Sequence, residues 1–143
     1  MPNVIFLDTN ILIYAASGRK SDPAKWAISL DLFEQPHATI SGQVMAEFYA
    51  VTLQKRYLDP ARAARWLDTL ALMPMVDVDA GLVVEGAAIA RRYHISYWDG
   101  ALIAASDRCG AEMLYTEDLN HGQLYSSVRV INPFRGAAIG ISP

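Results

Sequence analysis

The chain has 143 residues, of which 52% are hydrophobic and 19% are charged. That length suits one ordinary domain with enough apolar material for a core, so we expect a single domain over residues 1–143 and exclude global disorder. The formal net charge of −3 excludes binding of nucleic acid through a broadly basic surface. Any contact with nucleic acid then requires a local site, a bound cation or a partner.

The location of the protein is constrained by its cysteine and by its apolar runs. The single cysteine, Cys109, cannot form an internal disulfide, which fits a reducing compartment and predicts a cytoplasmic protein. The first apolar run is short and ends in Asp8, so we predict no secretory signal. No stretch approaches the roughly 18 apolar residues that a membrane span requires.

Short apolar runs alternate with helical patterns along the chain. The first run, Val4–Leu7, has the composition of a buried parallel strand, and a helix follows from Ile11 to Ala15, with a loop at Ser17–Pro23. The predicted strands are 4–7, 38–40, 75–78, 112–115 and 128–131. The later helices are predicted to begin at the capping residues Asp22, Ser41, Asp59, Asp79 and Ser96. This alternation predicts a parallel sheet with helices on both faces, and residues 136–143 are expected to form a loosely held tail.

Acidic residues stand at the ends of several predicted elements. Asp8 follows the first strand, Asp118 lies just beyond the fourth, Asp99 is in the first turn of a helix, and Glu47 shares a helix face with Gln43. Parallel strands end at the same edge of a sheet, so Asp8 and Asp118 are predicted to share that edge. Carboxylates gathered there repel one another, which raises the pKa of at least one of them unless a cation is bound. Oxygen ligands select Mg²⁺ or Mn²⁺, which bridge phosphates and lower the pKa of a bound water.

Four segments give the chain a resemblance to a known family. They are Phe6–Leu12, Gln43–Phe48, Trp98–Ala105 and Leu114–Leu119, and they follow the order and spacing of PIN-domain nucleases of the VapC-like toxin kind. The resemblance implies a three-layer α/β/α sandwich with a five-stranded parallel sheet. It also implies metal-dependent cleavage of RNA, with Asp8, Glu47, Asp99 and Asp118 as catalytic and metal-binding residues. The chain is thus predicted to be an Mg²⁺- or Mn²⁺-dependent endoribonuclease.

Two positions complicate the match. Gly100 stands where the family more often has alanine, and glycine weakens a helix by roughly 1 kcal/mol relative to alanine. Glu117 precedes Asp118, so either residue is a candidate for the fourth acid, with Asp118 giving the better alignment. Thr9, Asn10, Thr116 and Glu117 are expected to hold the acids or to contact substrate.

Each functional interpretation has a structural alternative. Asp8 is also a suitable helix cap, Ser96 and Asp99 have the spacing of a capping box, and Glu47 alone is an ordinary solvated acid. The three histidines lack the spacing of metal ligands. Trp98 is the tryptophan we single out, because it precedes a predicted ligand. Lys55-Arg56 either offsets a helix dipole or contacts phosphate.

Three functions compete at this stage. The first is an endoribonuclease, the toxin of a toxin–antitoxin pair. The second is a catalytically silent PIN-like module that binds RNA or protein, although such a module has no use for a carboxylate cluster. The third is a phosphotransferase of haloacid-dehalogenase type, which requires Asp-x-Asp-x-Thr, whereas this chain has Asp8-Thr9-Asn10.

The expected partners are an RNA substrate, a small antitoxin protein and a second copy of the chain. Self-association is predicted from the high hydrophobic content, through the second half of the first helix and the segment around Trp26.

Overall fold

The computed structural model describes residues 3–136, which form one hydrophobic core covered by helices. The helices are α1 (Thr9–Ser21), α2 (Pro23–Phe33), α3 (Gly42–Gln54), α4 (Pro60–Leu70), α5 (Ala80–Tyr93) and α6 (Tyr97–Arg108). The strands are β1 (Ile5–Leu7), β2 (Ala38–Ser41), β3 (Met75–Val76), β4 (Met113–Tyr115), β5 (Leu124–Tyr125) and β6 (Val128–Ile131). The predicted tail at 136–143 lies outside the described residues from residue 137 onward.

The strands form one sheet in the order β3-β2-β1-β4-β6-β5. The five predicted strands are all present and run parallel, which confirms the α/β fold. The sheet is nevertheless mixed, because β5 adds a sixth strand that pairs antiparallel to β6, with Tyr125 opposite Val128. Sequence reasoning missed β5, since a strand of two residues is too short to carry a recognisable alternation.

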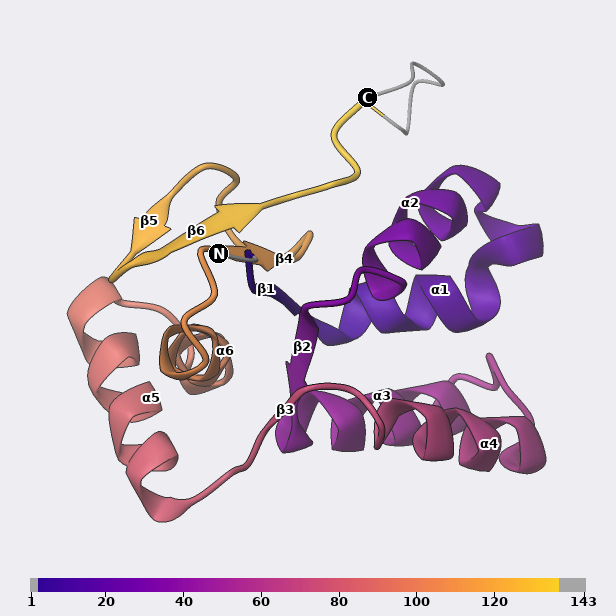
Figure 1. The fold of residues 1–143 in the computed structure, drawn as a ribbon, viewed down its shortest axis with the longest axis horizontal. Helices are drawn as coiled ribbons and strands as arrows, with labels where there is room; N and C mark the ends of the chain where they lie inside the picture. The colour runs from indigo at the N-terminus through magenta and orange to yellow at the C-terminus, as the bar shows by residue number, and fades with distance from the viewer. Residues whose placement is uncertain (1–2, 137–143) are drawn as a thin grey trace.

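Helices cover both faces of the sheet. Figure 1 shows α1 to α4 on one side of the sheet and α5 and α6 on the other. The chain leaves β1 toward β2 on one side, whereas β4 and β6 extend the sheet on the other side of β1. The order of the strands therefore reverses between β1 and β4, and open α/β sheets bind their ligands beyond the strand ends at such a point.

The helix boundaries follow the predicted capping residues with one correction. Each of Asp22, Ser41, Asp59, Asp79 and Ser96 caps a helix and accepts a backbone N–H through its side chain. The first helix is longer than predicted, because α1 continues through Gly18 to Ser21. A Cβ at Gly18 would lie 3.3 Å from Cβ of Trp26, so this glycine allows α1 and α2 to approach closely. Tertiary packing thus outweighs the low helix propensity of glycine.

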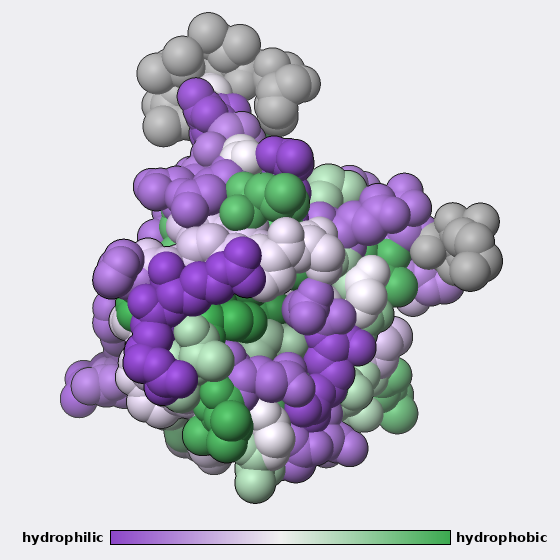
Figure 2. All heavy atoms as spheres, turned by 90° about the vertical axis from the view of Figure 1, so that its left-hand side faces the viewer, coloured by the Kyte–Doolittle hydropathy of each residue, from purple (hydrophilic) through white to green (hydrophobic). Residues whose placement is uncertain are grey.

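The exposed apolar side chains do not lie where self-association was expected. The large hydrophobic residues with exposed side chains are Tyr57, Leu72, Val78, Val83, Val84, Trp98 and Leu124, and none of them belongs to α1 or α2. Val84 on α5 is 68% exposed. Figure 2 shows the side of the molecule on which α5 lies, where hydrophobic residues stand between hydrophilic ones. No helix within residues 3–136 combines the length and the apolar character needed to cross a membrane.

Two glycines allow α5 and α6 to pack tightly against each other. A Cβ at Gly100 would overlap the carbonyl oxygen of Gly86 and lie 3.0 Å from Cβ of Ala90. A Cβ at Gly86 would lie 3.0 Å from Cα of Ala101. Gly100 is therefore required by the close approach of the two helices, and its departure from the family's alanine is a feature of this packing.

We expect Gly100→Ala to lower the free energy of unfolding by about 1–3 kcal/mol, the usual cost of overpacking a tight contact. Helix propensity alone predicts the opposite, a gain of roughly 1 kcal/mol. Gly81→Ala on α5 is the control, because a Cβ there meets nothing closer than 3.4 Å. Urea unfolding of the three proteins measures the difference. A Gly100→Ala protein as stable as the Gly81→Ala protein would contradict the helix packing described above.

Candidate active site

Asp8 lies at the tip of β1 and is 5% exposed. Its Oδ1 accepts a hydrogen bond from the Thr9 N–H at 2.6 Å, so Asp8 is the N-cap of α1, as the structural alternative predicted. Its Oδ2 accepts from the Thr116 hydroxyl at 2.8 Å and from Asn10 Nδ2 at 3.3 Å. These bonds join the carboxylate to α1 and to the residue that follows β4. The capping role and a role in a site are compatible, because Oδ1 accepts one hydrogen bond and retains a second lone pair.

The environment of Asp8 favours its protonated form. Burial is the largest cause, and together with the negative charges of Asp118 and Glu47 it raises the pKa of Asp8 from 3.8 to about 6. The hydrogen bonds from Thr116 and Thr9 act in the opposite direction and lower it. Asp8 thus has the raised pKa that was expected of one of the clustered acids, but burial contributes more to it than the repulsion on which that expectation rested.

Glu47 lies on α3, and its side chain lines the same cavity as Asp8. Its Oε1 accepts from Gln43 Nε2 at 3.1 Å, one helical turn away, and its Oε2 accepts from the Thr9 hydroxyl at 3.3 Å. Gln43 and Thr9 thus hold the two oxygens of Glu47 from two different helices. Glu47 is half-buried and oriented, which differs from the free surface acid that the structural alternative describes.

Asp99 enters from the first turn of α6. Its backbone N–H donates to the Ser96 hydroxyl at 3.1 Å, which is one half of a capping box. The other half, a bond from the Ser96 N–H to the Asp99 carboxylate, is not formed within the part of the chain that the structure describes. The carboxylate of Asp99 is consequently available to the cavity. Trp98 beside it is 61% exposed and lies at the rim.

The segment after β4 separates the two candidates for the fourth acid. The buried Thr116 hydroxyl accepts from the Asp118 N–H at 3.1 Å, and Asn10 Nδ2 donates to Asp118 Oδ2 at 3.1 Å. Asp118 therefore faces Asp8. Glu117 turns away and binds Lys25 Nζ at 3.0 Å.

Glu117 is held by a small network of its own. Tyr14 of α1 donates to Glu117 Oε1 at 2.9 Å, and Lys25 of α2 also reaches the Tyr14 oxygen at 3.2 Å. Burial lowers the pKa of Lys25, but the hydrogen bonds to Glu117 and Tyr14 outweigh it and the pKa is raised. Glu117 is thus tied to α1 and α2, while the next residue turns toward Asp8.

All four predicted acids line one cavity of about 240 Å³. Its walls are formed by Asp8, Thr9, Asn10, Ile13, Gln43, Glu47, Val51, Trp98, Asp99, Leu102 and Asp118. None of these is a lysine, an arginine or a histidine. We call this space the acid cavity. It lies at the reversal of strand order, where the topology predicts a ligand site.

The donor set of the acid cavity fits a hard divalent cation. Carboxylate, hydroxyl and amide oxygens face the cavity, and no basic side chain offsets their charge. Within residues 3–136, however, no three acidic, histidine or cysteine side chains stand in an arrangement ready to hold a metal ion. A metal bound here would draw the carboxylates together from their positions in this structure.

The sequence analysis did not identify the residues that hold Glu117 and Asp118 in different orientations after β4. Lys25 and Tyr14 carry no motif, and only the contact of α1 with α2 brings them to Glu117. The one available signal was the spacing of Asn10, Tyr14 and Ser17, which places them on one face of α1.

An acid cavity at the reversal point of an α/β sheet lies where proteins of this architecture bind their ligands. The sequence matches the PIN domain family over residues 5–126, and the chain therefore belongs to that family. No curated protein matches the sequence at a significant level.

Solved structures share the fold at low sequence identity. A toxin–antitoxin complex from Klebsiella pneumoniae is 21% identical with a TM-score of 0.69, over 92% of this chain and 98% of that chain. VapC20 of Mycobacterium tuberculosis, a toxin that cleaves the sarcin–ricin loop, is 18% identical with a TM-score of 0.64, over 80% and 91%. VapBC2 of Rickettsia felis, bound to a DNA fragment from its promoter, is 15% identical with a TM-score of 0.59, over 89% and 96%.

The raised pKa of Asp8 predicts how stability depends on pH without metal. The native state holds a proton that the unfolded chain releases, so stability is full below about pH 4 and is lost as the pH rises through about 6. A change from 3.8 to about 6 corresponds to about 3 kcal/mol. Asp8→Asn removes this loss, so its melting temperature should rise relative to the original protein between about pH 4 and about pH 7.

Thermal melts in EDTA across this range measure the difference. Asp59→Asn is the control, because Asp59 is an exposed helix cap far from the acid cavity in sequence and element. Curves for Asp8→Asn and the original protein that stay parallel with pH would show that Asp8 ionises normally.

Proposed function

We propose that the protein is a metal-dependent endoribonuclease and the toxin component of a toxin–antitoxin pair. The observation that carries the proposal is the acid cavity, in which Asp8, Glu47, Asp99 and Asp118 converge from four separate segments. Membership of the PIN domain family and likeness to toxin structures support it. A silent binding module gains nothing from carboxylates placed together without a basic neighbour, since their repulsion only costs stability.

The residues of the acid cavity have distinct roles in this proposal. Asp8, Glu47, Asp99 and Asp118 would hold Mg²⁺ or Mn²⁺, and the bound ion supplies a Lewis acid and a more acidic water. Thr116 and Thr9 keep a hydrogen bond on each Asp8 oxygen and so favour its ionised form. Asn10 fixes the separation of Asp8 and Asp118 by donating to both. Without a cation the cavity repels the phosphates of RNA, so substrate binding is tied to metal binding.

The partners and the location belong to the same proposal. We propose that an antitoxin protein binds this chain, because two of the similar structures are toxin–antitoxin pairs by name. We further propose that the protein acts in the cytoplasm, where Cys109 stays reduced and RNA is the available substrate.

Metal removal and single substitutions test the nuclease proposal. EDTA should abolish cleavage of a set of structured RNAs, and Mg²⁺ or Mn²⁺ should restore it. Asp99→Asn and Asp118→Asn should each lose cleavage, because each removes one metal-binding charge from the cavity. Glu112→Gln is the control, since Glu112 is exposed and lies outside the cavity. Undiminished cleavage in excess EDTA would falsify the proposed mechanism, and no cleavage under any condition would favour the silent module.

Metal-linked stabilisation separates Glu117 from Asp118. Mn²⁺ at about 100 times its dissociation constant should stabilise the original protein by about 2.7 kcal/mol. Glu117→Gln should retain most of this gain, because Glu117 binds Lys25 and not the cavity. Asp118→Asn should lose most of it. Thermal melts with and without Mn²⁺ decide the matter, and the reverse pattern would make Glu117 the fourth acid.

We also propose a homodimer that uses the face of α5. Val83 and Val84 are adjacent there and 43% and 68% exposed, and contiguous exposed apolar side chains are a feature of protein interfaces. Val84→Glu should give a monomer by light scattering, whereas Leu72→Glu, at a position 87% exposed at the end of α4, should not change the mass. A monomeric original protein at high micromolar concentration would rule the dimer out.

A further inference from the structure

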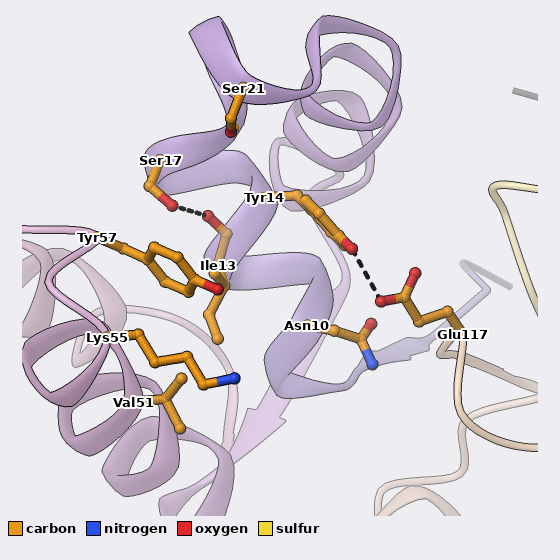
Figure 3. Close-up of a pocket in the computed structure, with 10 residues that line it drawn as sticks. Asn10, Ile13, Tyr14, Ser17, Ser21, Val51, Lys55, Tyr57 and Glu117 are labelled. Carbon is orange, nitrogen blue, oxygen red and sulfur yellow. Dashed lines mark hydrogen bonds between the residues drawn. The ribbon is translucent and has the colours of Figure 1, made fainter. Parts of the chain in front are cut away.

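A second cavity adjoins the acid cavity. It has a volume of about 430 Å³, within the range of about 300–1,000 Å³ that is common for ligand sites. Its walls come from α1, from the C-terminal end of α3 and the segment that follows it, and from Glu117, and Figure 3 shows them. The two cavities share Asn10, Ile13 and Val51 as wall residues, so they are continuous parts of one surface. We call this second space the α1–α3 pocket.

The charge of the α1–α3 pocket is opposite to that of the acid cavity. Figure 3 shows the Lys55 amine directed into the pocket, below the ring of Tyr57. Within residues 3–136 this amine forms no ion pair and no side-chain hydrogen bond. The negative charge of Glu117 on the opposite wall is already compensated by Lys25 at 3.0 Å. The remaining charge in the pocket is therefore the positive charge of Lys55.

The other walls suit a planar ring with polar edges. Tyr57 is 47% exposed, which leaves its ring accessible, and Ile13 and Val51 supply an aliphatic floor. Ser17 and Ser21 add hydroxyls, of which the Ser17 hydroxyl donates to the Ile13 carbonyl at 2.8 Å and keeps its acceptor lone pairs free for a ligand. An aromatic ring beside a cation is the combination that binds single-stranded nucleic acid, through stacking on a base and contact with a phosphate.

Asn10 connects the two cavities. Its amide nitrogen donates to Asp8 and Asp118 in the acid cavity. Its amide oxygen is buried and accepts no hydrogen bond from any residue between 3 and 136, and Figure 3 shows it on the side of Tyr14, opposite the nitrogen. A ligand that occupied both cavities would therefore pass this single side chain.

We propose that the α1–α3 pocket binds the nucleotide next to the scissile phosphate of a single-stranded RNA, with Tyr57 stacked on its base and Lys55 bound to its phosphate. This rests on the proposed nuclease function. An RNA strand that is cleaved in the acid cavity must extend beyond that cavity. The α1–α3 pocket adjoins it and contains the uncompensated positive charge of Lys55. A protein ligand would fit Lys55 equally well but has no reason to run on into a cavity lined by carboxylates.

RNA binding by variants of the pocket tests the proposal. The probe is a fluorescein-labelled single-stranded RNA of about 12 nucleotides, inside the usual footprint of such sites. Its dissociation constant is measured by anisotropy with Mg²⁺ at several salt concentrations, with every protein carrying Asp99→Asn so that the probe is not cut. Tyr57→Leu should weaken binding by roughly 5- to 150-fold, the usual loss for one base–aromatic stack, and Tyr57→Phe should recover most of it because the ring remains. Lys55→Met should reduce the slope of log affinity against log salt by about 0.7, the value for one phosphate contact on a single strand.

Lys20→Met is the matched control, because Lys20 is an exposed lysine of α1 that does not line the pocket. Thermal melts of each variant separate loss of binding from loss of fold. If the original protein binds and cleaves RNA while Tyr57→Leu and Lys55→Met bind as it does, the pocket is not a subsite and the nuclease proposal stands. If those variants lose only a protein partner, the pocket is a protein-binding site and our proposal is wrong. If the original protein neither binds nor cleaves RNA, both proposals fail.

Discussion

The burial of one carboxylate at the tip of β1 is the constraint on which the site depends. Asp8 is 5% exposed, and its two oxygens are held by Thr9, Asn10 and Thr116. These bonds connect the first strand and the first helix to the segment after β4, which is far from them in sequence. A buried carboxylate is tolerated only when its oxygens are satisfied, so the network fixes how β1, α1 and β4 meet. The pKa of Asp8 is still raised, because the hydrogen bonds offset only part of the free-energy cost of burying the charged carboxylate.

The same edge of the sheet carries two surfaces of opposite charge. One side is lined by Asp8, Glu47, Asp99 and Asp118, and Lys55, which forms no ion pair within residues 3–136, lies on the other. Asn10 stands between them, with its nitrogen toward the acids and its oxygen away from them. The ion pair between Lys25 and Glu117 contributes to this difference in charge. Lys25 compensates the negative charge of Glu117 in the α1–α3 pocket, while Asp118 lines the acid cavity.

The position of Asp99 shows how packing far from the site sets its geometry. Asp99 is in the first turn of α6, and the next residue, Gly100, lies against the Gly86 carbonyl of α5. A side chain at Gly100 would push the start of α6 away from α5 and move Asp99 with it. From the sequence alone, Gly100 is expected only to weaken its helix. In the structure it allows the close contact between α5 and α6 that positions Asp99.

The sequence by itself determined the elements and the acids. The apolar runs indicated the five parallel strands, and Asp22, Ser41, Asp59, Asp79 and Ser96 marked helix starts, because strand burial and helix capping are local properties. The placement of Asp8 and Asp118 at one edge followed from the rule that parallel strands end together, whereas Glu47 and Asp99 were predicted from the resemblance to the PIN family.

Only the tertiary structure decided what depends on distant contacts. It extended α1 through Gly18, added the two-residue strand β5, placed the exposed large apolar side chains outside α1 and α2, and turned Glu117 away from Asp118. Each of these depends on a packing or pairing contact: Gly18 lies against Trp26 of the next helix, β5 pairs with β6, and Glu117 binds Lys25 of α2. Local patterns carry no information about such partners, since the contact exists only once the helices have packed on the sheet.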